Sequence, residues 1–301
     1  MDANFRMRAL VIGASGQVGG ALCGELARRG HSVTGTHARV AAPGTVPLDL
    51  ADAAAVERLV GEVGPDWVFC AGALTRVDYC EDHPDEAGRL NRDGPRAAAR
   101  AAARTGAGFV LYSSEYVFDG TAGPYAEDDR PNPLSVYGRT KWEAELAVRD
   151  ALSRCLVVRT TVVYGPERQQ KNFVYQVIRC CRAGERMLVP ADQVSSPTYN
   201  GDLAAASVEL AERGTTGIVH VAGTSVLDRY RFAVLAAQVF DLDSAWLVPV
   251  STASLGQRAT RPLRGGLNVD RALRTLTTPL RSAPEGLETM RKAIAPQEKL
   301  R

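Results

Sequence analysis

The fold is decided by the stretch Met7-Arg-Ala-Leu-Val-Ile12 and the loop Gly13-Ala-Ser-Gly16-Gln-Val-Gly19 that follows it directly. Residues 7–12 form the near-continuous apolar run of a parallel strand that is buried on both faces. Gly13 allows a tight turn, Gly16 lets the backbone approach a pyrophosphate, and Gly19 lets a following helix lie close to the sheet. Strand, glycine loop and helix in this order predict a dinucleotide-binding loop, with the positive end of the helix beside the phosphates.

Predicted strands and helices alternate along the chain from this point. We expect helices over 18–29, 53–63, 95–104 and around 137–141, and a loop over 119–133. The expected strands, in chain order, are 31–36, 46–48, 66–70, 108–113, 155–159 and 218–222. This alternation predicts an α/β fold, a doubly wound parallel (Rossmann) sheet with helices on both faces.

The pattern changes after Tyr164, where prolines become more frequent and the expected elements shorter. We therefore predict two domains. The dinucleotide-binding domain comprises 1–164 plus about 198–230, and a smaller, discontinuous substrate domain comprises about 165–197 plus 231–301.

Composition excludes several classes of protein. Of the 301 residues 45% are hydrophobic and 23% charged, and the net charge of +2 gives no reason to expect nucleic acid or a membrane surface. The sequence contains no apolar run near ~20 residues and no apolar N-terminal stretch typical of a signal peptide. Six cysteines without a Cys-x-x-Cys pair and four scattered histidines argue against a metal site. They indicate reduced thiols and a cytoplasmic protein.

The end of the second strand, Thr34-Gly-Thr-His-Ala-Arg39, distinguishes between cofactors. It lacks the carboxylate that would hold the ribose hydroxyl of NAD, whereas Arg39 or Thr36 could bind a 2′-phosphate. We therefore expect NADP(H) to be preferred, with NAD(H) as the alternative. The other interpretation of Arg39 is a solvated loop charge, and that of Asp49 is a helix N-cap. The expected cofactor-binding residues are Gly13, Ser15, Gly16, Gln17, Val18, Gly19, Arg39, Asp49, Leu50, Ala71, Gly72, Ala73, Tyr137 and Lys141.

A reactive group is indicated by Tyr137-Gly-Arg-Thr-Lys141. Four residues apart on a helix, the two side chains share a face, and a neighbouring ammonium is expected to lower the phenol pKa. Ser114 ends the strand before this helix, at the edge of the sheet where ligands bind, and could hydrogen-bond a carbonyl beside the tyrosine. The alternatives are a surface helix pair and a capping hydroxyl. In this context we expect the tyrosine to donate a proton while a nicotinamide supplies hydride.

Taken together, these motifs resemble the extended short-chain dehydrogenase/reductases, and most closely the dTDP-4-dehydrorhamnose reductases. The resemblance covers nearly the whole chain. Besides the glycine loop it is carried by the stretches 113–120, 124–127, 136–141, 159–165, 172–174, 192–198 and 261–267.

The resemblance implies roles for named residues. Ser114, Tyr137 and Lys141 take the positions of the catalytic triad, and Asn91 that of an asparagine that helps order the active site. Substrate-binding positions are implied for four residues: Glu115, Tyr116, Asn172 and Arg261. Three residues near the expected pocket depart from the family pattern. Glu115 stands where the family usually has aspartate, Val162 where it has tryptophan, and Ser195 where it has glycine.

The implied activity is NADPH-dependent reduction of the 4-keto group of a nucleotide-linked 4-keto-6-deoxysugar, with dTDP as the expected nucleotide and a homodimer as one expected state. A 4-epimerase would use the same scaffold. A 4,6-dehydratase is disfavoured because Glu115 is followed by Tyr116 rather than by a second acid or base. A further alternative is a non-catalytic regulatory subunit, because the methionine adenosyltransferase beta subunit is similar to these reductases.

Overall fold

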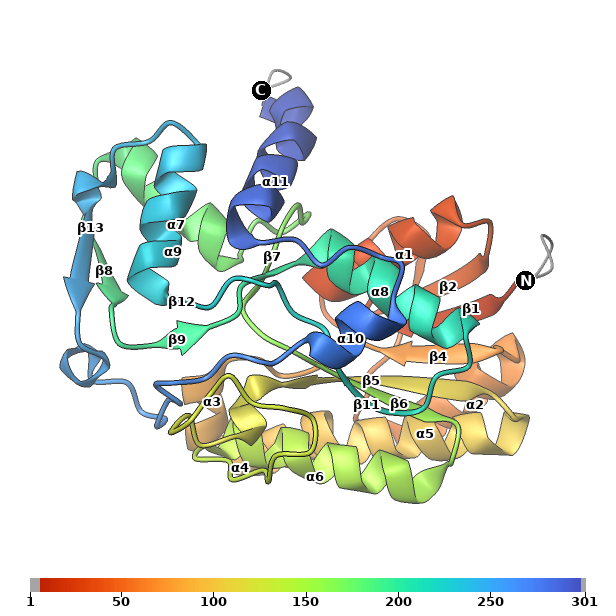
Figure 1. Cartoon of the computed structure of the whole chain (residues 1–301). Coiled ribbons are helices and arrows are strands. Elements are labelled where there is room, and N and C mark those ends of the chain that lie inside the picture. Colours follow the sequence, from red (N-terminus) through yellow and green to blue (C-terminus); the bar gives the residue numbers. More distant parts are fainter. Residues whose placement is uncertain (1–5, 299–301) are drawn as a thin grey trace.

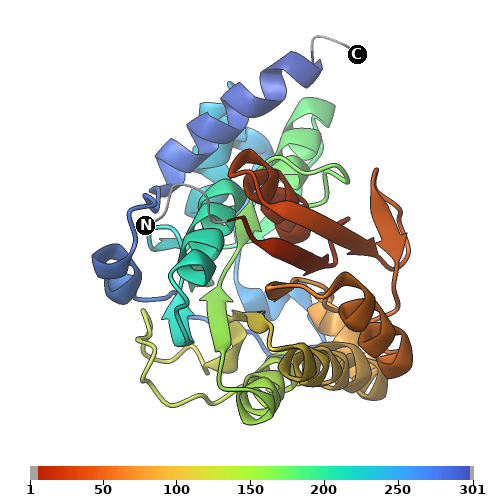
Figure 2. The same cartoon turned by 90° about the vertical axis from the view of Figure 1, so that its right-hand side faces the viewer.

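The computed structural model describes residues 6–298. Its centre is a seven-stranded sheet in the order β11-β6-β5-β4-β1-β2-β3, with all neighbouring strands parallel. Figures 1 and 2 show helices packed on both faces of this sheet. The predicted doubly wound sheet is therefore confirmed. Its strands are β1 (Arg8–Ile12), β2 (Ser32–His37), β3 (Thr45–Pro47), β4 (Trp67–Cys70), β5 (Gly108–Ser114), β6 (Cys155–Thr160) and β11 (Gly217–His220).

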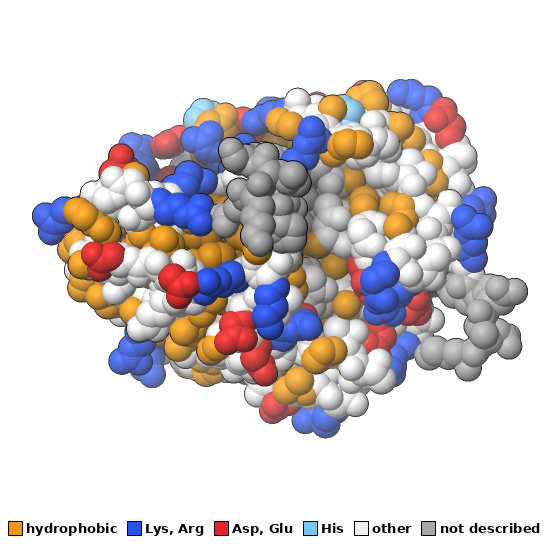
Figure 3. All heavy atoms as spheres, turned by 90° about the horizontal axis from the view of Figure 1, so that it is seen from above, with side chains coloured by type: hydrophobic (Ala, Val, Ile, Leu, Met, Phe, Trp, Pro, Cys, Tyr) orange, Lys and Arg blue, Asp and Glu red, His pale blue; other side chains and the backbone are white. Residues whose placement is uncertain are grey.

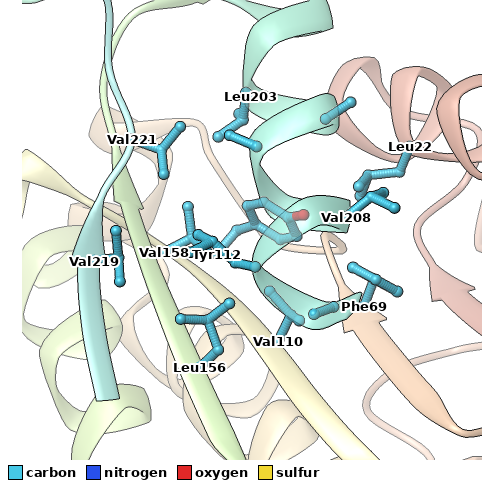
Figure 4. Close-up of a cluster of buried hydrophobic side chains, with 14 of the residues drawn as sticks. Leu22, Phe69, Val110, Tyr112, Leu156, Val158, Leu203, Val208, Val219 and Val221 are labelled. Carbon is cyan, nitrogen blue, oxygen red and sulfur yellow. The ribbon is translucent and has the colours of Figure 1, made fainter. Parts of the chain in front are cut away.

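Two apolar cores separate the sheet from its helices. One lies under α1 (Gln17–Arg28) and α8 (Asn200–Glu212), and the other under α2 (Ala53–Val63), α5 (Gly94–Thr105) and α6 (Val136–Ala151). Figure 4 shows the labelled side chains of β5, β6 and β11 lying against those of α8 in the first core. Because both faces of the sheet are covered at its centre, strands β4, β5 and β6 consist wholly of buried residues, whereas β2 and β3 at the edge are partly exposed.

A third core lies away from the sheet. It is formed by α7 (Phe173–Ala183), α9 (Arg229–Val239), α11 (Ala283–Glu298) and the parallel pair β8 (Met187–Pro190) and β13 (Leu247–Val250). Figure 1 shows these elements grouped to one side of the sheet. The C-terminal part of the chain is divided between two cores. Leu267, Val269 and Ala272, in the segment around α10 (Asp270–Thr275), pack into the first core, whereas α11 belongs to the third. The predicted division into two domains stays a prediction.

Several short elements were not expected from the sequence. Between β4 and α5 the chain forms α3 (Val77–Asp82), α4 (Pro84–Gly88) and a π-helical turn, Arg89–Asp93. These elements are too short to show the 3.6-residue apolar period of a longer helix. Other short strands are β7 (Val163–Tyr164), β9 (Val194–Ser195), β10 (Thr198–Tyr199) and β12 (Leu227–Asp228).

The surface seen from above in Figure 3 carries Lys and Arg side chains interspersed with Asp and Glu rather than one basic patch. Among residues 6–298, no helix has the length and apolar character needed to span a bilayer. Nor does that part of the chain hold three or more His, Cys, Asp or Glu side chains grouped as metal ligands.

Candidate cofactor groove and active site

A groove of about 630 Å³ lies at the carboxyl ends of β1, β2, β3 and β4. This is the edge of a doubly wound sheet at which ligands bind. Nine of the residues expected to bind a cofactor form part of its wall: Gly13, Ser15, Gly16, Arg39, Asp49, Leu50, Ala71, Gly72 and Ala73.

The glycines of the loop are required by close backbone approaches. Gly13 has φ +86°, and a Cβ at this position would lie 2.6 Å from the nitrogen of Gly72. A Cβ on Gly19 would lie 2.2 Å from the carbonyl oxygen of Gly13, so this glycine permits helix–loop packing. Gln17 faces a neighbouring hollow, and Val18 packs against the first core.

Helix α1 leaves the N–H groups of its first turn without a capping side chain, because its N-cap is Gly16. An anion at this end of the helix would satisfy these donors. Thr36, expected as a contact for a 2′-phosphate, is buried and accepts a hydrogen bond from the Gly13 N–H at 3.1 Å. It therefore supports the loop from behind. The residues present fit a dinucleotide diphosphate.

The part of the groove wall near the end of β2 carries charged residues, of which only Arg39 was predicted from the sequence. Arg39 lies in the wall and is mostly exposed, and its Nη2 is 3.4 Å from Oε1 of Glu86. Arg89, from the π-helical turn, lines the same wall. Neither Glu86 nor Arg89 was predicted as a site residue, since their short elements carry no motif. Asp49 is not a helix cap, because Asp52 caps α2 by accepting from the Ala55 N–H.

The expected reactive residues meet at the carboxyl end of β5. Ser114 is the last residue of this strand, and its hydroxyl oxygen accepts from the Tyr116 N–H at 3.2 Å. The same hydroxyl lies near enough to Tyr137 on α6 to affect the pKa of that phenol. The Tyr137 ring is half-buried and meets the ring of Tyr116 edge-on, with 5.6 Å between the centroids. Lys141 lies one turn further along α6 and is 3% exposed, so its ammonium lies inside the protein rather than at the surface. Asn91 donates to Thr140 of α6 at 3.4 Å and holds the Leu74 backbone, which ties this helix to the chain after β4.

The direction of the pKa shifts differs from the expectation for an ammonium-sensitised phenol. Burial raises the pKa of Tyr137, and the nearby Ser114 hydroxyl opposes the rise. Burial lowers the pKa of Lys141, opposed by the nearby Cys70 and Glu145. The prediction of a lowered tyrosine pKa was therefore wrong. Spacing on a helix indicates a shared face, but it does not reveal how much water the two groups lose on folding.

A buried ion pair lies behind this centre. Arg159 of β6 and Glu145 of α6 are 1% and 0% exposed and approach to 2.7 Å. Ser113, the neighbour of Ser114, donates to Glu145, and Glu145 lies one turn after Lys141 on α6. The pair therefore fixes the strand end and the helix that carry the reactive residues.

The four residues expected to bind substrate come from three separate segments, because Glu115 and Tyr116 are neighbours. Glu115 is buried, and its Oε2 accepts from the Gly266 N–H at 2.7 Å. Asn172 caps α7 and donates to the Gly165 carbonyl at 2.9 Å. Arg261 donates to Asp78 at 2.8 Å, while its Nη1 is buried with no partner among the residues described.

Comparison with known proteins agrees with this geometry. The fold and groove define the class of extended short-chain dehydrogenase/reductases. Residues 7–295 match the family model described as the RmlD substrate binding domain, and the chain belongs to this family.

Similar proteins carry two kinds of name. The chain is 34% identical to the dTDP-4-dehydrorhamnose reductase of Mycolicibacterium smegmatis, over 95% of this chain and 86% of that protein. It is 33% identical to methionine adenosyltransferase 2 subunit beta of Bos taurus, over 88% and 81%. The crystal structure of dTDP-4-dehydrorhamnose reductase from Bacillus anthracis in complex with NADP superposes with a TM-score of 0.89, at 29% identity, covering 96% of this chain and all of the other.

Proposed function

We propose that this protein is an NADPH-dependent reductase of a nucleotide-linked 4-keto-6-deoxysugar, with dTDP as the nucleotide and NADH as a second usable cofactor. The observation that carries the proposal is the grouping of Ser114, at the end of β5, with Tyr137 on α6 and with the buried Lys141 one helical turn further along that helix. Relatives named dTDP-4-dehydrorhamnose reductase, and one such structure with NADP bound, support this choice of substrate and cofactor.

The cofactor would be held by the glycine loop and by the groove wall. N–H groups of the first turn of α1 would meet the diphosphate, Asp49 and Leu50 the adenine, and Arg39 a 2′-phosphate. A bound NADPH would supply the hydride that adds to C4 of the sugar. Lys141 would hydrogen-bond the nicotinamide ribose.

The proton for the new hydroxyl would come from Tyr137. Hydride addition turns the C4 carbonyl oxygen into an alkoxide, which takes the phenolic proton to give the alcohol. The raised pKa of Tyr137 suits this direction of reaction, because the phenol stays protonated until the stronger base forms. Ser114 would orient the carbonyl from the same side, and the Lys141 ammonium would stabilise the phenolate left behind.

The sugar nucleotide would lie between β5 and the segments after it. We propose that Tyr116 contacts the sugar and that Arg261 meets the diphosphate, because its Nη1 is a buried donor free for an anion. Glu115 and Asn172 already hold backbone groups at 2.7 and 2.9 Å. These two residues would therefore shape the site from its edge.

A second candidate is a regulatory subunit without turnover, favoured by the identity to methionine adenosyltransferase 2 subunit beta. The two functions separate in one experiment. The purified chain is incubated with NADPH and a panel of nucleotide-linked 4-keto-6-deoxysugars while NADPH absorbance and product configuration are followed. Stoichiometric NADPH consumption supports the reductase. No consumption on any sugar, together with recovery of a stoichiometric enzyme partner, would support the subunit instead.

Copurified NAD with sugar interconversion and no net loss of NADPH would indicate a 4-epimerase. We further propose that the protein works in the cytoplasm and as a homodimer. Six free cysteines are in keeping with a reducing compartment. Light scattering during gel filtration tests the dimer.

A further inference from the structure

The segment Pro166–Lys171, here called the strap, crosses from the third core to the cofactor groove. Gln169 Nε2 donates to the carbonyl oxygen of Ser15 in the glycine loop at 3.1 Å. Arg168 Nη1 donates to the carbonyl of Ala41, in the loop after β2, at 2.9 Å. The strap is thus attached to the glycine loop and to the loop after β2, although more than 120 residues separate the partners in sequence.

The conformation of the strap is fixed by one internal hydrogen bond and by two hydrogen bonds from neighbouring helices. The Glu167 carboxylate accepts from the Lys171 N–H at 2.8 Å, and Arg179 donates to the Gln170 carbonyl at 2.6 Å. At its base Asn200 donates to the Pro166 carbonyl at 2.8 Å. Position 171 is therefore fixed relative to α7 before any ligand binds.

Lys171 is an exposed cationic residue in the wall of the groove. Lys171 lines the groove together with Gln169, Ser15 and Gly16. Among residues 6–298 its ammonium makes no ion pair or hydrogen bond, whereas Arg39 in the same wall faces Glu86. An unpaired cation beside a glycine loop and an uncapped helix end is the arrangement expected for a site that binds a diphosphate.

We propose that Lys171 binds the pyrophosphate of the dinucleotide, and that Gln169 and Arg168 are positioning residues that hold the strap over it. The assignment to the pyrophosphate rather than the 2′-phosphate follows from Gln169, which anchors the strap on the glycine loop itself. This inference rests on the proposed use of a dinucleotide and adds a phosphate contact from the second half of the chain. The cofactor is then held from two sides, so strap release accompanies its departure.

The test measures dissociation constants for NADPH and NADH by nicotinamide fluorescence, at several salt concentrations, in the full chain. For Lys171→Gln we expect both constants to rise by about tenfold, the loss expected for one charged hydrogen bond. The salt dependence should become shallower, because one phosphate contact with a cation is gone. Lys171→Arg should restore both readouts. The control is Lys292→Gln on α11, which removes the same charge far from the groove.

Gln169→Ala separates positioning from charge. This substitution should weaken the binding of both cofactors by a smaller factor and speed their release. It should leave the salt dependence of binding unchanged, because Lys171 remains. The inference is overturned if Lys171→Gln binds like Lys292→Gln, or if it weakens NADPH alone. A native chain that binds neither cofactor would overturn the proposed function itself, and this inference with it.

Discussion

The Tyr137 hydroxyl is the atom on which the proposed reaction depends. Tyr137→Phe removes the proton donor but keeps the ring that packs edge-on against Tyr116. We expect turnover to fall by about 10²–10⁴-fold or to background, with the NADPH dissociation constant close to that of the native chain. Steady-state kinetics on the accepted sugar nucleotide and cofactor titration measure the two effects. Tyr230→Phe on α9, which packs against the third core, serves as the control for a lost phenol outside the site, and full activity of Tyr137→Phe would contradict the mechanism.

Cofactor choice is also decided by single residues. Glu86 lies 3.4 Å from Arg39, so its carboxylate competes with a 2′-phosphate for the same guanidinium. Because Arg39 is largely exposed, we expect Arg39→Gln to weaken the binding of NADPH by only about three- to tenfold and to leave the binding of NADH nearly unchanged. Glu86→Gln should act in the opposite direction and tighten NADPH. Equal effects of either substitution on both cofactors would show that this pair does not read the 2′-phosphate.

Residue patterns predicted the glycine loop, Arg39 and the Tyr137–Lys141 pair because each belongs to a short motif with a fixed spacing. Lys171 and Arg89 reach the same groove from segments that carry no such motif. The sign of the Tyr137 pKa shift was also beyond the sequence. It depends on burial by α3, β5 and the loops around them, which no local pattern reports.

Element boundaries followed the sequence wherever caps and apolar runs agree. Helix α2 begins and ends as expected at 53 and 63, because Asp52 caps its start and Gly64, with φ +51°, ends it. The central strands β1, β4, β5 and β6 were visible as apolar runs because both of their faces are buried. The short helices over 77–93 were missed, since a single turn or two cannot display a period.

Helix α6 offers a matched test of what holds the reactive residues in place. Glu145→Ala leaves Arg159 buried without its carboxylate, so we expect the free energy of unfolding to fall by about 3–5 kcal/mol. Glu143, on the same helix, pairs with Arg92 at the surface, and Glu143→Ala should cost less than about 1 kcal/mol. Urea denaturation of both variants gives the comparison. Equal losses of unfolding free energy in the two variants would show that burial does not determine how much the Arg159–Glu145 pair contributes to stability.

At the scale of the whole molecule, the site is assembled from contacts between distant segments. Gly266 meets Glu115 across 151 residues of sequence, and Arg261 meets Asp78 across 183. Such contacts depend on how the segment 261–267 returns to the first core beside the sheet, which is why the sequence suggested the substrate side only by resemblance.

Low pH should destabilise the fold because a buried histidine, His220, lies in the edge strand β11 of the main sheet. His220 of β11 is 0% exposed, and burial lowers its pKa to about 3, with the Arg159 charge acting in the same direction. The neutral ring fits its partners, because Nε2 can accept from the Arg159 guanidinium and Nδ1–H can donate to the Asn268 carbonyl.

The lowered pKa fixes the sign of the pH dependence. Between about pH 6.5 and about pH 3 the unfolded chain binds a proton at His220 that the folded chain does not, so stability is lost as pH falls through this window. The slope from this group approaches about 1.4 kcal/mol per pH unit. His220→Gln should lower stability at pH 7 but flatten the decline from pH 6 to 4, as measured by urea unfolding at each pH. His83→Asn, at an exposed position, should leave the native slope in place, and an equally steep decline in His220→Gln would assign acid sensitivity to other groups.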